Sequence, residues 1–297
     1  RLIKNVTGSL PGPAWVCQPL WHSYDMDGDH LKTLILFGAL LLSTPLLAAQ
    51  LDLELGANSR TWQTEELLKH PQVQTITVTN DVSYKRDMSY RAVPVAALLT
   101  GIKPEDHLQA VALDGFAAEL SAAPLLNAKG ARAWLAIEDP AKPWPALSEG
   151  KHSAGPFYLV WTDPQAGNIS PEQWPFEVAS IKRMAPVAQR FPALLPDPAL
   201  AADDPVNKGF ALFQKNCLAC HRLNGAGDAQ FGPDLNIPFN PTEYFGADFL
   251  TRYIRDPQGL RQWPQAKMPG FTAAVLPDGD LEMLVGYLKH MAGRKVK

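Results

Sequence analysis

The sequence predicts two domains of different fold class, an α+β domain over residues 50–184 and an all-α domain over residues 205–297. Short stretches of strand character dominate the first part, and helical periodicity dominates the last part. Proline is dense in the residues between them, 185–204. Because proline at this density interrupts both helices and central strands, we expect those residues to form a semi-rigid linker.

The length and composition of the chain are typical of a globular protein. Its 297 residues leave room for two domains, 46% of them are hydrophobic, and the net charge is −3. A net charge this weak argues against nucleic acid as a partner.

An apolar run near the start of the chain has the layout of a signal peptide. Residues 34–42 are apolar apart from one glycine, follow a lysine, and form too short a run for a typical membrane span. We expect a leader over residues 26–49, cleaved near Ala49, and export of the protein. Met26 stands where an initiator methionine would, so residues 1–25 are expected to be a non-native upstream extension. The alternative is an uncleaved leader that anchors the protein in the membrane.

The first domain shows a mixed pattern of strands and helices. Thr64 can cap a helix over residues 65–69, and Pro94 can open a helix over residues 95–100 that Gly101 ends. The strand candidates are short runs rich in β-branched, aromatic or other apolar residues, at 73–79, 110–113, 117–120, 133–137, 157–161 and 176–181.

The second domain contains the run Cys217-Leu218-Ala219-Cys220-His221, which is the attachment pattern of c-type haem. The two thiols can add to the two vinyl groups of one haem as thioethers, and the adjacent imidazole is then held beneath the iron. A zinc site would need a second pair of ligands, and a thioredoxin-like pair needs no histidine. We expect one covalent haem c, bound by Cys217 and Cys220, with His221 as an iron ligand.

Helical periodicity flanks this run on both sides. Upstream, Gly209, Phe213 and Cys217 recur every fourth residue and so share one face of a helix. Downstream, residues 278–291 predict a closing amphipathic helix, because apolar residues follow the helical spacing at Leu281, Leu284, Val285 and Leu288.

Together these features resemble a class I cytochrome c over about residues 203–297. In that family the first and last helices cross through a glycine and two aromatic residues, which correspond to Gly209, Phe213 and Tyr287. The segment Phe231-Gly232-Pro233-Asp234-Leu235 resembles the one whose proline carbonyl accepts the Nδ1 hydrogen of the axial histidine. The resemblance therefore implies that Pro233 orients His221. It also places aromatic side chains around the porphyrin, here Phe249, Tyr253 and Trp263.

The same resemblance implies the second iron ligand. The segment Lys267-Met268-Pro269-Gly270-Phe271 is similar to the loop that presents a methionine thioether, so Met268 is expected to complete the coordination. With both axial positions filled, the iron transfers electrons and has no open position for a substrate. The weaker candidates are Met283, Met291 and His290 in the last helix, and Met184 outside the domain.

The first domain resembles the molybdopterin-binding domain of sulfite-oxidase-type enzymes, through residues 64–68, 75–78, 90–99 and 155–160. Those enzymes bind molybdenum through a cysteine thiolate that here would fall near Thr79-Asn80-Asp81, and this domain contains no cysteine. The basic residue that the family has after its Gly-x-Pro-like turn is also missing, since Tyr158 stands in that area. We expect this fold without molybdopterin, serving as a docking module.

These expectations define two candidate functions. The first is a periplasmic monohaem carrier of a Gram-negative bacterium that moves single electrons from a dehydrogenase to a terminal oxidase or another respiratory acceptor. The alternative is a molybdenum-dependent sulfite-type dehydrogenase in which the haem is the internal exit for electrons. The missing cysteine favours the carrier. We assign no catalytic residue, because His70, His107 and His152 are too scattered to indicate a ligand cluster.

Overall fold

The computed structural model describes residues 49–229, 231–262 and 268–296. Their buried apolar side chains form two hydrophobic cores, the first built from residues 51–181 and the second from residues 187–291. The predicted extension at residues 1–25 and the predicted leader, except Ala49, lie outside the described residues. No helix in the described parts combines the length and the apolar character that crossing a membrane requires.

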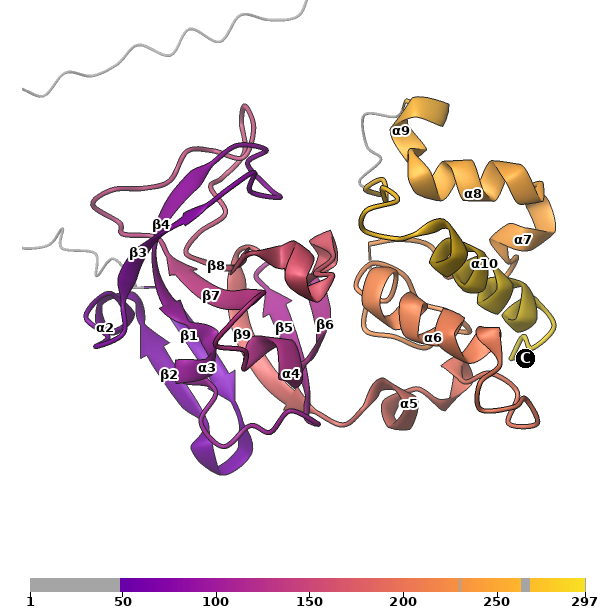
Figure 1. Cartoon of the computed structure of the whole chain (residues 1–297), viewed down its shortest axis with the longest axis horizontal. Coiled ribbons are helices and arrows are strands. Elements are labelled where there is room, and N and C mark those ends of the chain that lie inside the picture. Colours follow the sequence, from indigo (N-terminus) through magenta and orange to yellow (C-terminus); the bar gives the residue numbers. More distant parts are fainter. Residues whose placement is uncertain (1–48, 230, 263–267, 297) are drawn as a thin grey trace, which may run out of the picture. The chain divides into compact units, whose positions relative to one another are not determined.

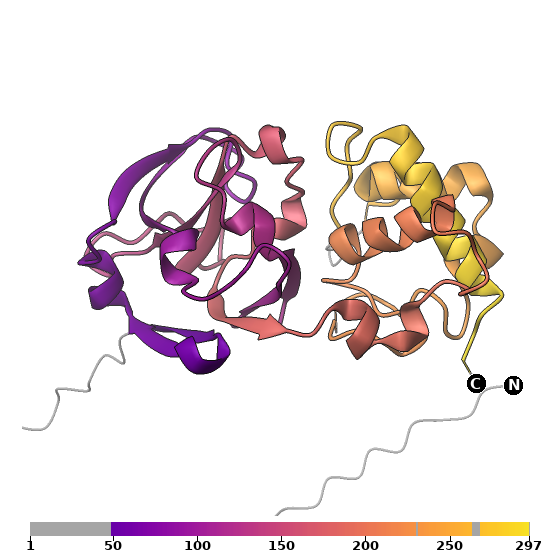
Figure 2. The same ribbon diagram turned by 60° about the horizontal axis from the view of Figure 1, so that its bottom comes forward.

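Two β-sheets enclose the first core (Figure 1, Figure 2). Neighbouring strands are antiparallel except β1 and β9, which are parallel. One sheet has the order β2-β1-β9-β5-β6, with strands Arg60–Gln63, Gln50–Glu54, Val178–Met184, His107–Ala112 and Ala117–Ser121. The other has the order β3-β4-β7-β8, with strands Gln74–Val78, Met88–Pro94, Arg132–Ile137 and Phe157–Thr162.

Both sheets contribute side chains to the same core. Leu108 on β5 and Leu120 on β6 meet it from one sheet, and Leu135 on β7 and Leu159 on β8 meet it from the other. Strands β7 and β8 are buried almost throughout, which explains why their sequences read as continuous apolar runs without polar alternation. Each of the six predicted strands is present, with bounds shifted by a few residues.

Three one-turn α-helices lie in this part of the chain, α2 (Thr64–Leu68), α3 (Val95–Leu98) and α4 (Ala122–Leu125). The prediction that Thr64 caps α2 is wrong. Gln63 is the capping residue, in a reciprocal capping box with Glu66, and the Thr64 hydroxyl donates to Ala49 O at 2.8 Å.

Among the helices, α6 (Pro205–Asn216), α8 (Ala247–Arg255) and α10 (Asp278–Ala292) contribute most to the second core. Two short helices, α7 (Pro241–Tyr244) and α9 (Pro257–Leu260), lie on either side of α8 in the sequence. Helix α6 begins at Pro205 because the Asp204 side chain accepts from Val206 N at 2.9 Å and proline needs no hydrogen-bond partner in the first turn. Helices α6 and α10 pack together as predicted.

The crossing of α6 and α10 depends on the three residues that the family resemblance singles out. The Phe213 and Tyr287 rings lie 5.4 Å apart between centroids, and both side chains are fully buried. A Cβ atom on Gly209 would lie 2.1 Å from the Met283 carbonyl oxygen, so only glycine allows this approach. The Tyr287 hydroxyl donates to Leu194 O at 2.7 Å, which satisfies its polar end.

The proline-rich stretch before α6 is more ordered than the sequence indicates. It contains the short helix α5 (Val187–Arg190) and the 3-10 helix η5 (Pro192–Leu194), although proline density argued against any helix there. Val187 and Leu194 are buried in the second core. Single turns suffice because each helix ends before the next proline, where a longer helix would lose a hydrogen bond.

Candidate haem-attachment site

The two candidate attachment cysteines lie on one turn of chain directly after α6. Cys217 ends the helix, with its N–H donating to Phe213 O at 2.9 Å, and Cys220 N donates to Cys217 O at 3.1 Å. Both thiols are free and partly buried. Burial raises the pKa of both thiols, that of Cys220 to about 12, so both are protonated at neutral pH. The spacing leaves both sulfur atoms free to form thioethers with one porphyrin.

A hydrogen bond at Nδ1 sets the orientation of the His221 imidazole. His221 Nδ1 lies 2.9 Å from Pro233 O, which is the contact that the cytochrome resemblance implies. With Nδ1 as the donor of this hydrogen bond, Nε2 is unprotonated and free to bind iron. Burial lowers the pKa of His221, against opposing effects of the Pro233 carbonyl and Asp234, and so favours the neutral ring that metal binding requires.

Gly232 brings the Pro233 carbonyl close to the imidazole. Its N–H donates to Cys220 O at 2.7 Å, which ties the loop to the attachment segment. A Cβ atom at this position would lie 2.4 Å from His221 Cε1 and 2.5 Å from Nδ1. Any larger residue would therefore displace either the ring or the loop that holds it.

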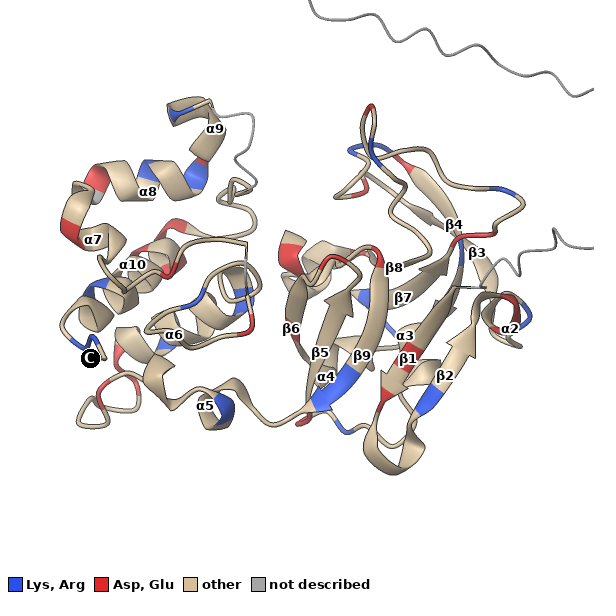
Figure 3. Cartoon of the chain, turned by 180° about the vertical axis from the view of Figure 1, so that it is seen from behind, with Lys and Arg blue, Asp and Glu red and all other residues tan. Residues whose placement is uncertain are grey.

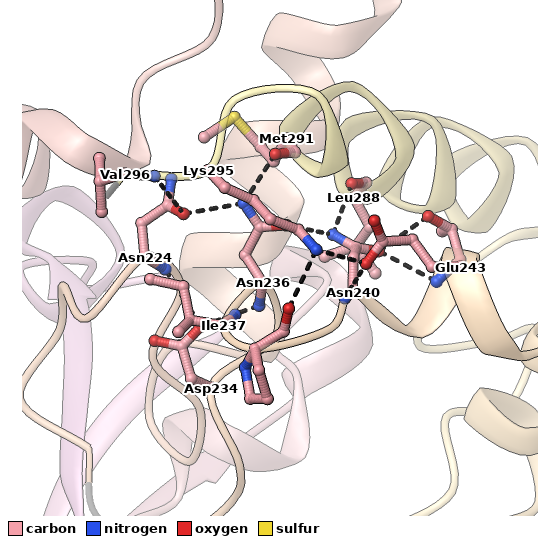
Figure 4. A network of polar contacts seen from close by, with 12 residues as sticks. Asn224, Asp234, Asn236, Ile237, Asn240, Glu243, Leu288, Met291, Lys295 and Val296 are labelled. Atoms are coloured by element: carbon pink, nitrogen blue, oxygen red, sulfur yellow. Dashed lines mark hydrogen bonds and ion pairs between the residues drawn. The ribbon is translucent and has the colours of Figure 1, made fainter.

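Three buried asparagines hold this loop against the last helix (Figure 4). The Asn236 amide donates to Asn224 Oδ1 at 2.8 Å and to Met291 O at 2.7 Å. The Asn240 amide donates to Asn236 Oδ1 and to Leu288 O, both at 2.9 Å. We call these residues the asparagine ladder. It satisfies carbonyl groups near the end of α10 and fixes the loop that carries Pro233.

Met268 lies half-buried against the second core, in the segment that follows α9. The structure does not join it to His221 by any contact among the described residues, so its role as iron ligand stays a prediction. Of the aromatic residues expected around the porphyrin, Phe249 and Tyr253 stack with ring centroids 6.1 Å apart. Trp263 lies outside the described residues.

The weaker ligand candidates have other roles in the structure. Met291 is 1% exposed and packs in the second core, and Met184 is the last residue of β9. His290 Nε2 accepts a hydrogen bond from Asp197 N at 3.0 Å, so this imidazole anchors the segment before α6.

Polar and charged residues of the sheet region, residues 50–184, and of α5 also contact α6 and the segment after the attachment cysteines, which the sequence does not reveal. Arg190 on α5 bridges Glu119 on β6 and Asp228, which follows the attachment cysteines. The Gln109 amide donates to Asp228 at 2.7 Å. Lys215 Nζ on α6 donates to Asn168 O at 2.5 Å. These partners lie between 38 and 119 positions apart in sequence, and no spacing rule connects residues so distant.

A buried carboxylate lies near Thr79-Asn80-Asp81, the position at which the resemblance to molybdenum-binding enzymes would place a thiolate. Asp81 is fully buried, and its carboxylate accepts hydrogen bonds from the Tyr90 hydroxyl at 2.9 Å and the Tyr158 hydroxyl at 3.2 Å. Its Oδ1 also accepts from Ser83 N and Tyr84 N, both at 2.9 Å. These donors saturate the carboxylate, a hard ligand that does not replace a thiolate. Near Asp81 the described residues therefore offer a saturated carboxylate and no thiolate.

The helical fold, the paired thiols and the oriented imidazole define a haem-binding domain of the c type. The model of the Cytochrome c family matches residues 206–292 of the chain. This part of the chain is therefore a cytochrome c domain, and such a domain implies covalently bound haem c and a haem-based electron-transfer function. Among curated proteins the chain has no match.

Proposed function

We propose that the protein is a periplasmic carrier that passes single electrons from a dehydrogenase to a terminal oxidase or another respiratory acceptor through one haem. The observation that carries this proposal is the pair of free thiols beside an imidazole whose Nδ1 is engaged by Pro233 O, within a cytochrome c domain. Bound haem supplies one-electron redox chemistry. The chain contributes two covalent anchors, a preset imidazole orientation and a hydrophobic core that limits the access of water.

We further propose that the sheet region serves as a docking module and does not bind a cofactor of its own. The saturated Asp81 carboxylate supports this, since it leaves no soft ligand at the position of the family thiolate. Basic and acidic residues alternate over the described elements (Figure 3). Such a mixture of both signs of charge is compatible with the transient, modest interfaces of redox complexes.

The proposal is tested by the metal and pigment content of protein made in a host with haem-maturation machinery. We expect about one haem iron per chain, retained after extraction with acidified acetone because thioether bonds survive that treatment. Colourless protein would contradict the electron carrier. Stoichiometric molybdenum would instead support the alternative, a sulfite-type dehydrogenase.

Replacing Met268 by alanine is expected to remove the second axial ligand. The low-spin spectrum should become partly or fully high-spin, and the midpoint potential should fall because the thioether stabilises ferrous iron. Met283→Ala is the matched control, since Met283 lies within α10, and it should keep the low-spin spectrum. An unchanged spectrum in Met268→Ala would show that another residue is the ligand.

A further inference from the structure

Glu172 is a buried carboxyl group held beside the haem-attachment segment. It lies in the 3-10 helix η4 (Pro171–Gln173), which a reciprocal capping box between Ser170 and Gln173 fixes in place. Helix η4 contacts both β6 and α6. The residue is 8% exposed, and its Oε2 accepts no hydrogen bond from any residue in the described ranges. A buried carboxyl oxygen without a partner is costly when it is charged.

The carboxyl group lies close enough to both attachment cysteines to affect their ionisation. After burial, the negative charge of Glu172 is the next cause that raises the pKa of the Cys217 and Cys220 thiols. These thiols are the atoms that would bond to the porphyrin, so the Glu172 carboxyl group lies within electrostatic range of the haem anchors. Burial raises the pKa of Glu172 itself to about 7, and a hydrogen bond with its own backbone N–H partly opposes this effect.

We propose that Glu172 is a redox-linked proton site, which binds one proton when the haem iron is reduced and releases it when the iron is oxidised. The inference rests on the proposed electron-carrier function. Ferric haem carries one more positive charge than ferrous haem, and in a buried setting this charge favours the Glu172 carboxylate. On reduction, the electron comes from the donor protein and the proton from solvent, and both return on oxidation.

The other charged groups on the elements around η4 are engaged elsewhere. Glu119 on β6 pairs with Arg190, while Lys208 and Lys215 on α6 contact Asp280 and Asn168 O. The thiols lose their titratable protons once they become thioethers. Asp114, whose charge also reaches Cys220, accepts from Phe116 N. Among the charged groups described around η4, Glu172 therefore stands out, because it is buried and its Oε2 has no hydrogen-bond partner.

The test is the midpoint potential of the holoprotein between pH 5 and pH 9, for wild type and Glu172→Gln. The wild-type potential should fall with rising pH around neutrality, because the proton stabilises the reduced state. A tenfold higher proton affinity in the reduced state corresponds to a total fall of about 59 mV. Glu172→Gln, which keeps the shape but cannot ionise, should remove this fall. Glu282→Gln removes an exposed carboxyl of α10 and should behave as wild type.

A second measurement uses the wild type alone, so that the test does not depend on haem attachment to the variant. Infrared difference spectra between reduced and oxidised protein should show a protonated carboxyl band that appears on reduction. The inference would be overturned by a wild-type midpoint potential that does not depend on pH, or by the absence of this band. It would also be overturned if Glu172→Gln kept the full fall of the potential with pH, which would point to the haem propionates. Protein without covalent haem would overturn the proposed function instead, so the two failures are distinguishable.

Discussion

Replacing Gly209 by alanine is expected to lower the free energy of unfolding of the cytochrome c domain by about 2–3 kcal/mol. The added methyl group would meet the Met283 carbonyl oxygen at 2.1 Å and Tyr287 Cβ at 2.7 Å. The first of these is backbone, which a rotamer change cannot move, so α6 and α10 must separate and lose packing around Phe213. Denaturant unfolding of the holoprotein, followed by the haem absorbance, measures the loss.

Gly286→Ala is the matched control for this prediction. Gly286 also lies within α10, but a Cβ atom there would meet nothing within 4 Å. Alanine is favoured over glycine in a helix interior by about 1 kcal/mol, so this variant should be slightly more stable than wild type. Equal effects of the two substitutions would contradict the close helix crossing.

Replacing Arg190 by leucine is expected to destabilise the protein by about 3 kcal/mol at neutral pH. The Glu119 side chain is 4% exposed, and loss of the guanidinium would leave its charge with fewer partners in a buried setting. Burial alone would raise the pKa of Glu119, but hydrogen bonds and charges from His107 and Arg190 outweigh it and hold the pKa below its ordinary value. Denaturant unfolding at several pH values measures the effect.

The pH dependence of this variant has a definite sign. A carboxyl with a lowered pKa contributes stability above its unfolded pKa, and this contribution disappears as the pH falls through the folded pKa. The deficit of Arg190→Leu should therefore shrink below about pH 4, near the ordinary carboxyl pKa. Arg183→Leu breaks an exposed pair with Asp106 and should change stability little at any pH. A deficit that is constant with pH would mean that Arg190 acts through packing alone.

Much of the cytochrome c domain could be predicted because its chemistry lies in short, local patterns. The Cys217–His221 run and the periodicity of α6 and α10 involve neighbouring residues, so spacing alone reveals them. The sheet region is predicted less completely, because β1, β2 and β4 were missed. In β1, Leu51 and Leu53 alternate over too few residues to stand out after the apolar run at residues 34–42. Helix α7 has a signal in the sequence, because Asn240 and Glu243 form the Asn-x-x-Glu pattern of a capping box.

The remaining parts of the site could not be found from spacing, because tertiary structure brings them together. Glu172 precedes Cys217 by 45 positions, and in sequence nothing separates it from the many exposed glutamates. Its burial against α6, and with it the raised pKa, exists only after the sheet region has folded. The asparagine ladder is similar: Asn224 reads as a turn residue, and its partner Arg294, just after α10, lies 70 positions along the chain.

The asparagine ladder has no group that titrates in the acid range, whereas Arg190 reaches the attachment segment through carboxylates. As the pH falls, we therefore expect the ion pair of Arg190 with Glu119 to be lost before the hydrogen bonds of the asparagine ladder. Protonation of Glu119 would weaken its ion pair with Arg190, while the uncharged amides still hold the loop behind His221. Iron coordination should persist after that ion pair is lost. The haem absorbance should therefore be retained at a pH at which the contacts of the sheet region with Arg190 are already weakened.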